Sequence, residues 1–264
     1  MIRKLSFIYI LLTISFNSSF ILKASEPIKC LNDYMLEKNT ADKLYNEGQY
    51  DKSIQIYKHI LSKHGISPEV FYNLGNCYYR LDSMAFAILY YEKSLKLDPS
   101  DNDVRTNLSI TRSKIKDKSS EGTTFFILAW WYSLINKLSL YAWKIIGFSL
   151  FFFSILLLVI WKTKIIDKYS KLLKYSAIIL LILSIISNFA AWQQYELNTN
   201  TQSAIITSQE IHVKGSPSNS SVDLFILHSG ARVRVLDDSM KEWCEIEFEV
   251  GKSGWIKKKN IAMI

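Results

Sequence analysis

The stretch FYNLGNCYYRLDSMAFAILYYEKSLKLDP, from Phe71 to Pro99, decides the fold of the N-terminal half of the chain. Its small and apolar positions recur 34 residues earlier in the sequence. Small residues at such positions let two helices approach, and larger apolar residues fill the space between them. The matched pairs are Ala41 and Gly75, Leu44 and Tyr78, Ser53 and Ala87, Tyr57 and Tyr91, and Ile60 and Ser94. A regular period of this length predicts a stack of helical hairpins.

The same stretch closely resembles the consensus of the tetratricopeptide repeat (TPR), with Pro99 closing the second helix. This resemblance implies an all-α TPR helical repeat domain over residues 34–118. The first repeat is less regular, because His64-Gly65 replaces the usual acidic-proline end. Polar character in the last helix fits the solubilising cap that repeat stacks need. The predicted parts are the repeats 34–67 and 68–101 and the capping helix 102–118.

A TPR array presents a concave groove along its leading helices, where a peptide or a partner helix could lie. The alternative for each groove tyrosine is that it only shapes the stack. With two repeats and a cap the groove is short, so we expect modest affinity unless a second contact site contributes. The residues predicted to line the groove are Lys38, Asp42, Tyr45, Glu69, Tyr72, Asn76, Tyr79, Thr106 and Ile110.

Some TPR families bind a C-terminal carboxylate through lysines, asparagines and an arginine at fixed positions. Lys38 and Asn73 match two of these positions. The other three are occupied by Asp42, Asp103 and Asn107, which remove the positive charge. A carboxylate clamp is therefore disfavoured.

Two long apolar runs follow the helical repeats. YAWKIIGFSLFFFSILLLVIW covers residues 141–161, and YSAIILLILSIISNFAAW covers residues 175–192. Both approach the roughly 20 apolar residues that a spanning helix requires. Tyr or Trp stands at each of their ends, where amphipathic rings favour the membrane interface. We therefore expect two transmembrane helices.

The loop between these runs, residues 162–174, carries five lysines and one aspartate. Short basic loops of this kind stay in the cytoplasm. The N-terminus has a short basic region followed by an apolar run, which predicts a signal peptide over residues 1–24, either cleaved after Ala24 or kept as an anchor. The chain is then expected to be a two-pass protein of a bacterial inner (cytoplasmic) membrane, with both soluble parts on the periplasmic side.

The net charge of +8 is concentrated in and around the membrane segments. Residues 25–122 balance 14 basic against 14 acidic side chains, so the repeats show no electrostatic footprint for nucleic acid. Residues 25–33 and 193–203 are expected to be linkers. Residues 119–140 are expected to form a linker and an interfacial helix on the outer membrane surface. That helix could alternatively pack against the repeats.

Residues 204–264 change to short β-branched and aromatic runs separated by turn signals, which predicts a small all-β barrel. The pattern resembles the bacterial SH3 family in Leu227-His228-Ser229-Gly230 and in Gly254-Trp255-Ile256. Members of that family commonly bind cell-wall peptides or protein segments. Trp243 and Trp255 could each stack on a ligand or fill the barrel; Trp243 is the candidate ligand-binding residue, and Trp255 is expected in the core. The predicted strands are 204–207, 210–214, 224–227, 232–237, 243–248, 254–257 and 261–264.

The order of parts resembles the BatE-type proteins of the Bacteroides aerotolerance (Bat) operon along nearly the whole chain. The closest local matches are the segment from Asn102 to Leu108 and the Leu-His-Ser-Gly to Gly-Trp-Ile region. The resemblance implies membrane partners with von Willebrand factor A-type domains and a part in tolerating oxygen or oxidative stress. The cysteines Cys30, Cys77 and Cys244 are scattered and indicate no redox role.

The sequence indicates no catalytic, cofactor-binding or metal-binding residues. Its four histidines, His59, His64, His212 and His228, form no recognisable motif with a cysteine. The favoured hypothesis is therefore a multidomain membrane protein that acts as a non-enzymatic interaction scaffold. The alternative is a cell-wall-binding accessory or a hydrolase of a peptidoglycan-processing system, because SH3-like domains often accompany peptidoglycan-cleaving domains.

Overall fold

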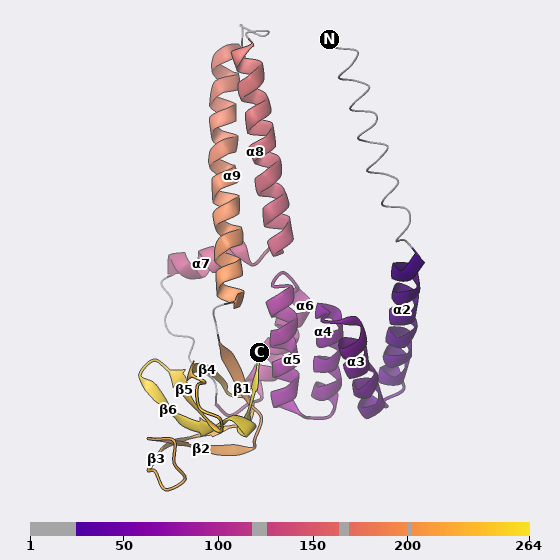
Figure 1. The fold of residues 1–264 in the computed structure, drawn as a ribbon, viewed down its shortest axis with the longest axis vertical. Coiled ribbons are helices and arrows are strands. Elements are labelled where there is room, and N and C mark those ends of the chain that lie inside the picture. Colours follow the sequence, from indigo (N-terminus) through magenta and orange to yellow (C-terminus); the bar gives the residue numbers. More distant parts are fainter. Residues whose placement is uncertain (1–24, 118–125, 164–168, 200–201) are drawn as a thin grey trace.

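The computed structural model describes residues 25–117, 126–163, 169–199 and 202–264. The predicted signal peptide lies outside these residues, as do part of the linker before the first apolar run and Lys164 and Lys168 of the basic loop. Figure 1 shows three parts, a layer of short helices, a long helical hairpin and a C-terminal sheet. The sheet lies beside one end of the helical layer, and the hairpin rises above both.

The helical repeats have clear turn and cap signals. Gly48 adopts φ +77° between the first two helices, a conformation that favours glycine. The Ser67 hydroxyl accepts a hydrogen bond from the Val70 N–H, and Pro68 follows it in the first turn, where no N–H is required. The helices are α2 (Ser25–Asn46), α3 (Tyr50–His64), α4 (Pro68–Arg80), α5 (Met84–Leu97) and α6 (Asn102–Ser113). Helix α2 therefore includes residues that were expected to be a linker.

Small residues bring the paired helices close together, as the period predicts. A Cβ atom added to Gly75 would lie 2.5 Å from Cδ1 of Tyr91. Ala41 is fully buried, and its carbonyl accepts a hydrogen bond of 2.9 Å from the Ser53 hydroxyl. The ring of Tyr57, the counterpart of Tyr91, is 1% exposed. The side chains that share the 34-residue spacing therefore form the contacts within each hairpin.

The C-terminal region folds into a seven-stranded antiparallel sheet with the order β3-β2-β6-β5-β4-β1-β7. Its strands are β1 (Ser203–Ile206), β2 (Glu210–Lys214), β3 (Asp223–His228), β4 (Arg232–Asp237), β5 (Trp243–Glu249), β6 (Lys252–Lys257) and β7 (Ile261–Met263). Each predicted strand is present, with its ends shifted by at most two residues. The short β-branched and aromatic runs between turn signals were therefore a reliable signal.

The sheet does not close into the predicted barrel. Its edge strands β3 and β7 are not hydrogen-bonded to each other. Strand β7 pairs with β1, and its Ala262 and the following Ile264 pack against the apolar cluster that Ile205 forms with residues of α5 and α6. This edge of the sheet therefore lies beside the helical repeats.

Trp255 was expected in the core of the sheet, and this prediction was wrong. Trp255 is half-buried, whereas its neighbour Ile256 is 1% exposed and belongs to the apolar core. Successive side chains of a strand point to opposite faces, so only one of the two can face the core. Gly254 shares the inner face with Ile256, where an added Cβ atom would lie 2.6 Å from Cγ1 of Val213.

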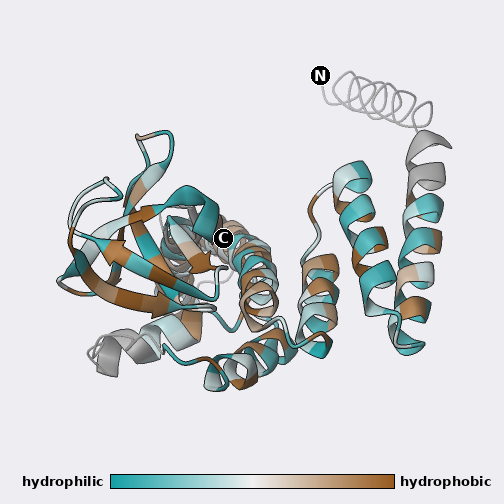
Figure 2. Ribbon diagram, turned by 90° about the horizontal axis from the view of Figure 1, so that it is seen from below, coloured by the Kyte–Doolittle hydropathy of each residue, from teal (hydrophilic) through white to brown (hydrophobic). Residues whose placement is uncertain are grey.

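Besides its own apolar core, the sheet shares an apolar cluster with the repeats. Ile205 of β1 is fully buried and packs in the cluster that contains Ile88 of α5 and Leu108 of α6. Gly230 adopts φ +91° and comes so close that an added Cβ atom would lie 2.7 Å from Cγ2 of Ile115. Figure 2 shows the sheet against the end of the helical layer, with the C-terminal end of the chain between them. The two parts therefore form a continuous unit.

Polar contacts surround this joint. Glu92 of α5 forms an ion pair with Arg112 of α6 and lies 3.6 Å from the Arg232 guanidinium of β4. Nδ1 of His228 lies 3.0 Å from the Asp117 carboxylate. These contacts connect three segments of the chain around the shared core.

Two long apolar helices form the hairpin. They are α8 (Leu140–Lys162) and α9 (Ser170–Thr199), and the predicted spans lie within them. Both are long and apolar enough to cross a membrane. Serine hydroxyls join them, since Ser154 donates to the Ala177 carbonyl and Ser184 donates to the Gly147 carbonyl, each at 2.8 Å. Small and hydroxyl-bearing residues at the contact are typical of helices packed in lipid.

The hairpin is attached to the repeats at its foot, where α7 (Phe126–Ile135) lies across α9 (Figure 1). The Arg105 guanidinium of α6 donates a hydrogen bond of 2.6 Å to the Asn136 carbonyl. The Gln194 amide donates to the carbonyls of Ile135 and Leu138, both at 3.1 Å. Helix α9 continues through most of the segment that was expected to be a linker after residue 192.

Candidate functional site

The concave side of the repeats contains two adjacent hollows that form one groove. The first has a volume of about 350 Å³ and the second about 250 Å³, and Tyr45 and Asn76 line both. The first hollow is lined by Lys38, Asp42, Tyr45, Asn46, Tyr57, Glu69, Asn73 and Asn76. The second is lined by Tyr45, Asn76, Tyr79, Arg80, Tyr91, Asn107 and Ile110. We call this surface the groove.

Most of the residues predicted for the groove are found in it. Tyr72 and Thr106 line neither hollow. The Tyr72 hydroxyl accepts a hydrogen bond of 3.2 Å from the Asn107 amide. The Thr106 hydroxyl donates to the Asn102 carbonyl of its own helix. They were predicted from repeat register alone, which gives the side of a helix but does not determine which residues line a hollow.

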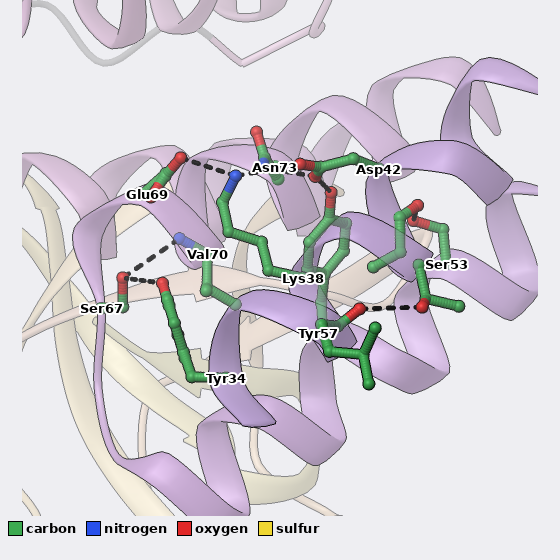
Figure 3. A network of polar contacts seen from close by, with 12 residues as sticks. Tyr34, Lys38, Asp42, Ser53, Tyr57, Ser67, Glu69, Val70 and Asn73 are labelled. Carbon is green, nitrogen blue, oxygen red and sulfur yellow. Dashed lines mark hydrogen bonds and ion pairs between the residues drawn. The ribbon is translucent and has the colours of Figure 1, made fainter. Parts of the chain in front are cut away.

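A network of polar contacts organises the first hollow (Figure 3). Lys38 forms ion pairs with Asp42 at 2.9 Å and with Glu69 at 2.8 Å. Oδ1 of Asp42 accepts hydrogen bonds from the Tyr57 hydroxyl and, at 3.3 Å, from the Asn73 amide. Desolvation lowers the pKa of Lys38, but the contacts with Glu69 and Asp42 outweigh it, so this pKa lies above its usual range. Burial and the Asp42 contact raise the pKa of Tyr57.

The second hollow repeats this arrangement. Oδ1 of Asn76 accepts hydrogen bonds from the Tyr91 hydroxyl at 2.7 Å and from the Asn107 amide at 3.1 Å. Asn76, Tyr91 and Asn107 stand 34 residues after Asp42, Tyr57 and Asn73, so each hollow contains the same triad. We call these two sets the triads. They differ in charge, because the acceptor is a carboxylate in the first and an amide in the second.

The triad tyrosines were not predicted as groove residues. Tyr57 and Tyr91 belong to the trailing helices, and their rings are each 1% exposed, as expected for core residues. Their hydroxyl groups nevertheless reach the floor of the groove. The sequence carried a signal, since an acceptor and two donors recur together at the repeat period. Arg80 also lines the second hollow, where its Nε donates to the Tyr45 hydroxyl at 3.3 Å. No repeated sequence pattern predicts this position.

The sheet contains the other candidate site, Trp243 of β5. Its ring is half-buried and lies outside the apolar core, with Nζ of Lys257 5.5 Å from the ring centroid. The two described cysteines, Cys77 and Cys244, are both buried. Burial raises the pKa of both thiols, that of Cys244 to about 11, which keeps them protonated and poorly nucleophilic.

Comparison with known proteins identifies one segment of the chain. Residues 68–101, which include α4 and α5, match the family model of the tetratricopeptide repeat. No curated protein matches the chain. The chain therefore contains a TPR repeat within a helical region, followed by an antiparallel sheet. A TPR repeat indicates interaction with protein partners.

Proposed function

We propose that this chain is a membrane-anchored interaction scaffold whose groove binds a segment of a partner protein. The repeated triads carry this proposal. Within each triad the buried tyrosine hydroxyl donates to the side chain of Asp42 or Asn76. Other amide atoms of the triad asparagines stay at the surface of the hollows. Across the described residues, Nδ2 of Asn76 and Oδ1 of Asn73 form no hydrogen bond. One is a donor and the other an acceptor, which suits the main chain of an extended peptide.

The charges of the groove favour a partner of mixed polarity. Lys38 is neutralised by Asp42 and Glu69, while Arg80 and Lys114 add positive charge beside Tyr45 and Tyr79. A strongly charged segment of either sign would meet a like charge in one of the hollows. We therefore expect a partner segment rich in amide and hydroxyl groups, with one acidic residue near Arg80.

We further propose that α8 and α9 span a bacterial inner membrane, with the lysine-rich loop in the cytoplasm and both the repeats and the sheet in the periplasm. Length, apolar composition and the five loop lysines support this placement. The hydrogen bond from the Arg105 guanidinium to the Asn136 carbonyl, at the base of the hairpin, keeps the groove near the membrane surface. Partners that are themselves membrane proteins are therefore favoured, such as the von Willebrand factor A-type proteins of a Bat-type complex.

The sheet serves in this proposal as an SH3-like module that binds a second partner or the cell wall through Trp243. The order of parts and the local sequence matches support a role in tolerating oxygen or oxidative stress. The protonated, buried thiols favour a scaffold over a thiol enzyme. No cofactor is required for this function.

Groove binding is tested by photocrosslinking in native membranes. A photoreactive residue at Asn46, inside the first hollow, should capture a partner protein, and the additional change Asn76→Ala should reduce the captured amount. The matched variant Thr106→Ala alters a residue outside both hollows and should leave capture unchanged. Equal capture in all three proteins would contradict groove binding.

Membrane topology is tested by labelling with a membrane-impermeant maleimide, in a chain whose Cys30 is replaced by serine. Ser220→Cys, in an exposed turn of the sheet, should react from the periplasmic side. Lys171→Cys, near the start of α9, should react only after the inner membrane is opened. The reverse pattern would overturn the proposed orientation.

A further inference from the structure

A third hollow, which we call the foot pocket, lies where the hairpin meets the repeats. Its volume is about 470 Å³, within the range of small-molecule sites. Segments far apart in the sequence form its walls, including Phe71 of α4, Leu97 of α5 and Leu140 at the start of α8. Tyr141, Tyr195 and Ile264 also line it. The foot pocket is mainly apolar, which distinguishes it from the polar groove.

Two lysines of α5, Lys93 and Lys96, stand in this apolar lining. Nζ of Lys96 donates a hydrogen bond of 2.9 Å to the main-chain oxygen of Ile264. Across the described residues, no carboxylate side chain lies within 4.0 Å of either ammonium group. The neighbouring acids are engaged elsewhere, Glu92 with Arg112 and Arg232 and Asp98 with Ser100. The foot pocket therefore contains two ammonium groups with no carboxylate side chain beside them, of which that of Lys96 is hydrogen-bonded to the main-chain oxygen of Ile264.

The pKa of Lys93 also indicates a positive charge without an opposite charge nearby. Desolvation and then the charge of Lys96 lower the pKa of Lys93 below its usual range. A bound anion would relieve both effects, because it would supply the missing opposite charge. A charged group held among apolar side chains without a partner is otherwise unfavourable.

The position of the foot pocket indicates the chemical class of its ligand. Leu140 and Tyr141 are the first residues of α8, and Tyr195 lies near the end of α9. If α8 and α9 span a membrane, as proposed above, this end of the hairpin lies at the level of the lipid headgroups, where tyrosines concentrate. An anion that enters there with an apolar chain attached is a phospholipid. Basic pockets between spanning helices bind anionic headgroups at the cytoplasmic side of membranes, and the same attraction would act at the periplasmic surface proposed here.

We infer that the foot pocket binds an anionic phospholipid, with the headgroup phosphate between Lys93 and Lys96 and an acyl chain against Phe71, Leu97 and Leu140. The bound lipid would fill the space between the hairpin and the repeats. It would therefore fix the height of the groove above the membrane. This inference rests on the proposed membrane anchoring.

The test uses the full-length protein in vesicles that contain phosphatidylglycerol with a photoreactive acyl chain. Mass spectrometry should locate the label on the peptides around Leu97 and Leu140. Phosphatidylcholine carrying the same chain should label them weakly, and excess inorganic phosphate should not compete. Lys93→Gln should reduce labelling about fivefold and the double change with Lys96→Gln about twentyfold. The matched control Lys162→Gln/Lys171→Gln, at the other end of the hairpin, should leave labelling of these peptides unchanged.

A second variant avoids any loss of structure caused by changing the lysines. Leu97→Trp fills the apolar part and keeps both charges, so it should also reduce labelling. Label spread evenly along α8 and α9, equal labelling by both lipids, or competition by inorganic phosphate would each overturn the lipid site. Release of the chain from membranes by alkaline carbonate would contradict the membrane anchoring instead. Retention in membranes without labelling of the foot pocket would contradict only the lipid site.

Discussion

The groove and the end of the helical stack that meets the sheet are built from the same run of helices, α2–α6. The groove is open to solvent, whereas that end is covered by the sheet. In the groove, each triad satisfies its own buried hydroxyl and leaves amide atoms facing solvent. At the end that meets the sheet, the apolar face of α5 and α6 is covered by Ile205 and the residues around β7. A repeat stack requires such cover, and here the chain supplies it. The groove is therefore the surface that is left for a partner.

The largest expected effect is at the joint. Ile205→Ala removes a fully buried side chain from the core that the sheet shares with the repeats. We expect a loss of about 2–4 kcal/mol in the free energy of unfolding, measured by urea denaturation in detergent. The same change at Ile226, which is 45% exposed on β3, is the matched control and should cost far less. Equal costs would mean that the joint adds no stability.

The next effect is in the first triad. Asp42→Ala leaves the Tyr57 hydroxyl and the Asn73 amide without their acceptor. We expect a loss of about 1–3 kcal/mol in the free energy of unfolding. Asp42→Asn keeps an acceptor oxygen and reproduces the residue found in the second triad, so most of the stability should remain. If both variants lose the same amount, the charge of Asp42 matters more than its hydrogen bonds.

A third effect concerns binding. Asn76→Ala removes the amide that faces both hollows, and we expect the affinity for a groove partner to fall about tenfold, which corresponds to about 1.4 kcal/mol. Isothermal titration with the partner segment found by crosslinking measures this change. Thr106→Ala should leave the affinity unchanged, because Thr106 bonds within its own helix. An equal loss in both variants would place the partner outside the groove.

The smallest effect is at the rim of the joint. Arg232→Gln removes a partly exposed ion pair of 3.6 Å with Glu92, and we expect a loss below about 1 kcal/mol in the free energy of unfolding. The loss should shrink further in high salt. Arg112→Gln, which changes the other partner of Glu92, should cost more because Arg112 also donates a hydrogen bond to Glu92. A loss from Arg232→Gln larger than that from Ile205→Ala would make the joint mainly electrostatic.

Local patterns explain how much of this fold the sequence predicts. The spacing that pairs Gly75 with Ala41 indicates a helix contact within each hairpin, and short β-branched and aromatic runs between turn signals indicate the strands of the sheet. The run Ala204-Ile205-Ile206 indicates a strand that is buried on both faces, because a continuous apolar run is typical of such strands. Its second face packs against the repeats.

The foot pocket and the open edge of the sheet were beyond sequence reasoning. Phe71, Leu140 and Ile264 meet only because the hairpin and the sheet dock on the same helical layer. Repeat register predicted Lys38 and Asn76 for the groove, and both line a hollow, since neighbouring repeats repeat their geometry. Thr106 was predicted in the same way but lines neither hollow, and its hydroxyl donates to the Asn102 carbonyl of its own helix. Register gives the side of a helix but not the hydrogen bonds made there.

The most direct test compares two photoreactive positions in native membranes. Asn46 lies in the first hollow, and Gln55 is an exposed residue of α3 that lies outside both hollows. A partner bound in the groove should crosslink from Asn46 and not from Gln55, and the crosslink should weaken when Asn76 is changed to alanine. Equal crosslinking from both positions, or none from Asn46, would contradict a groove that binds a partner protein.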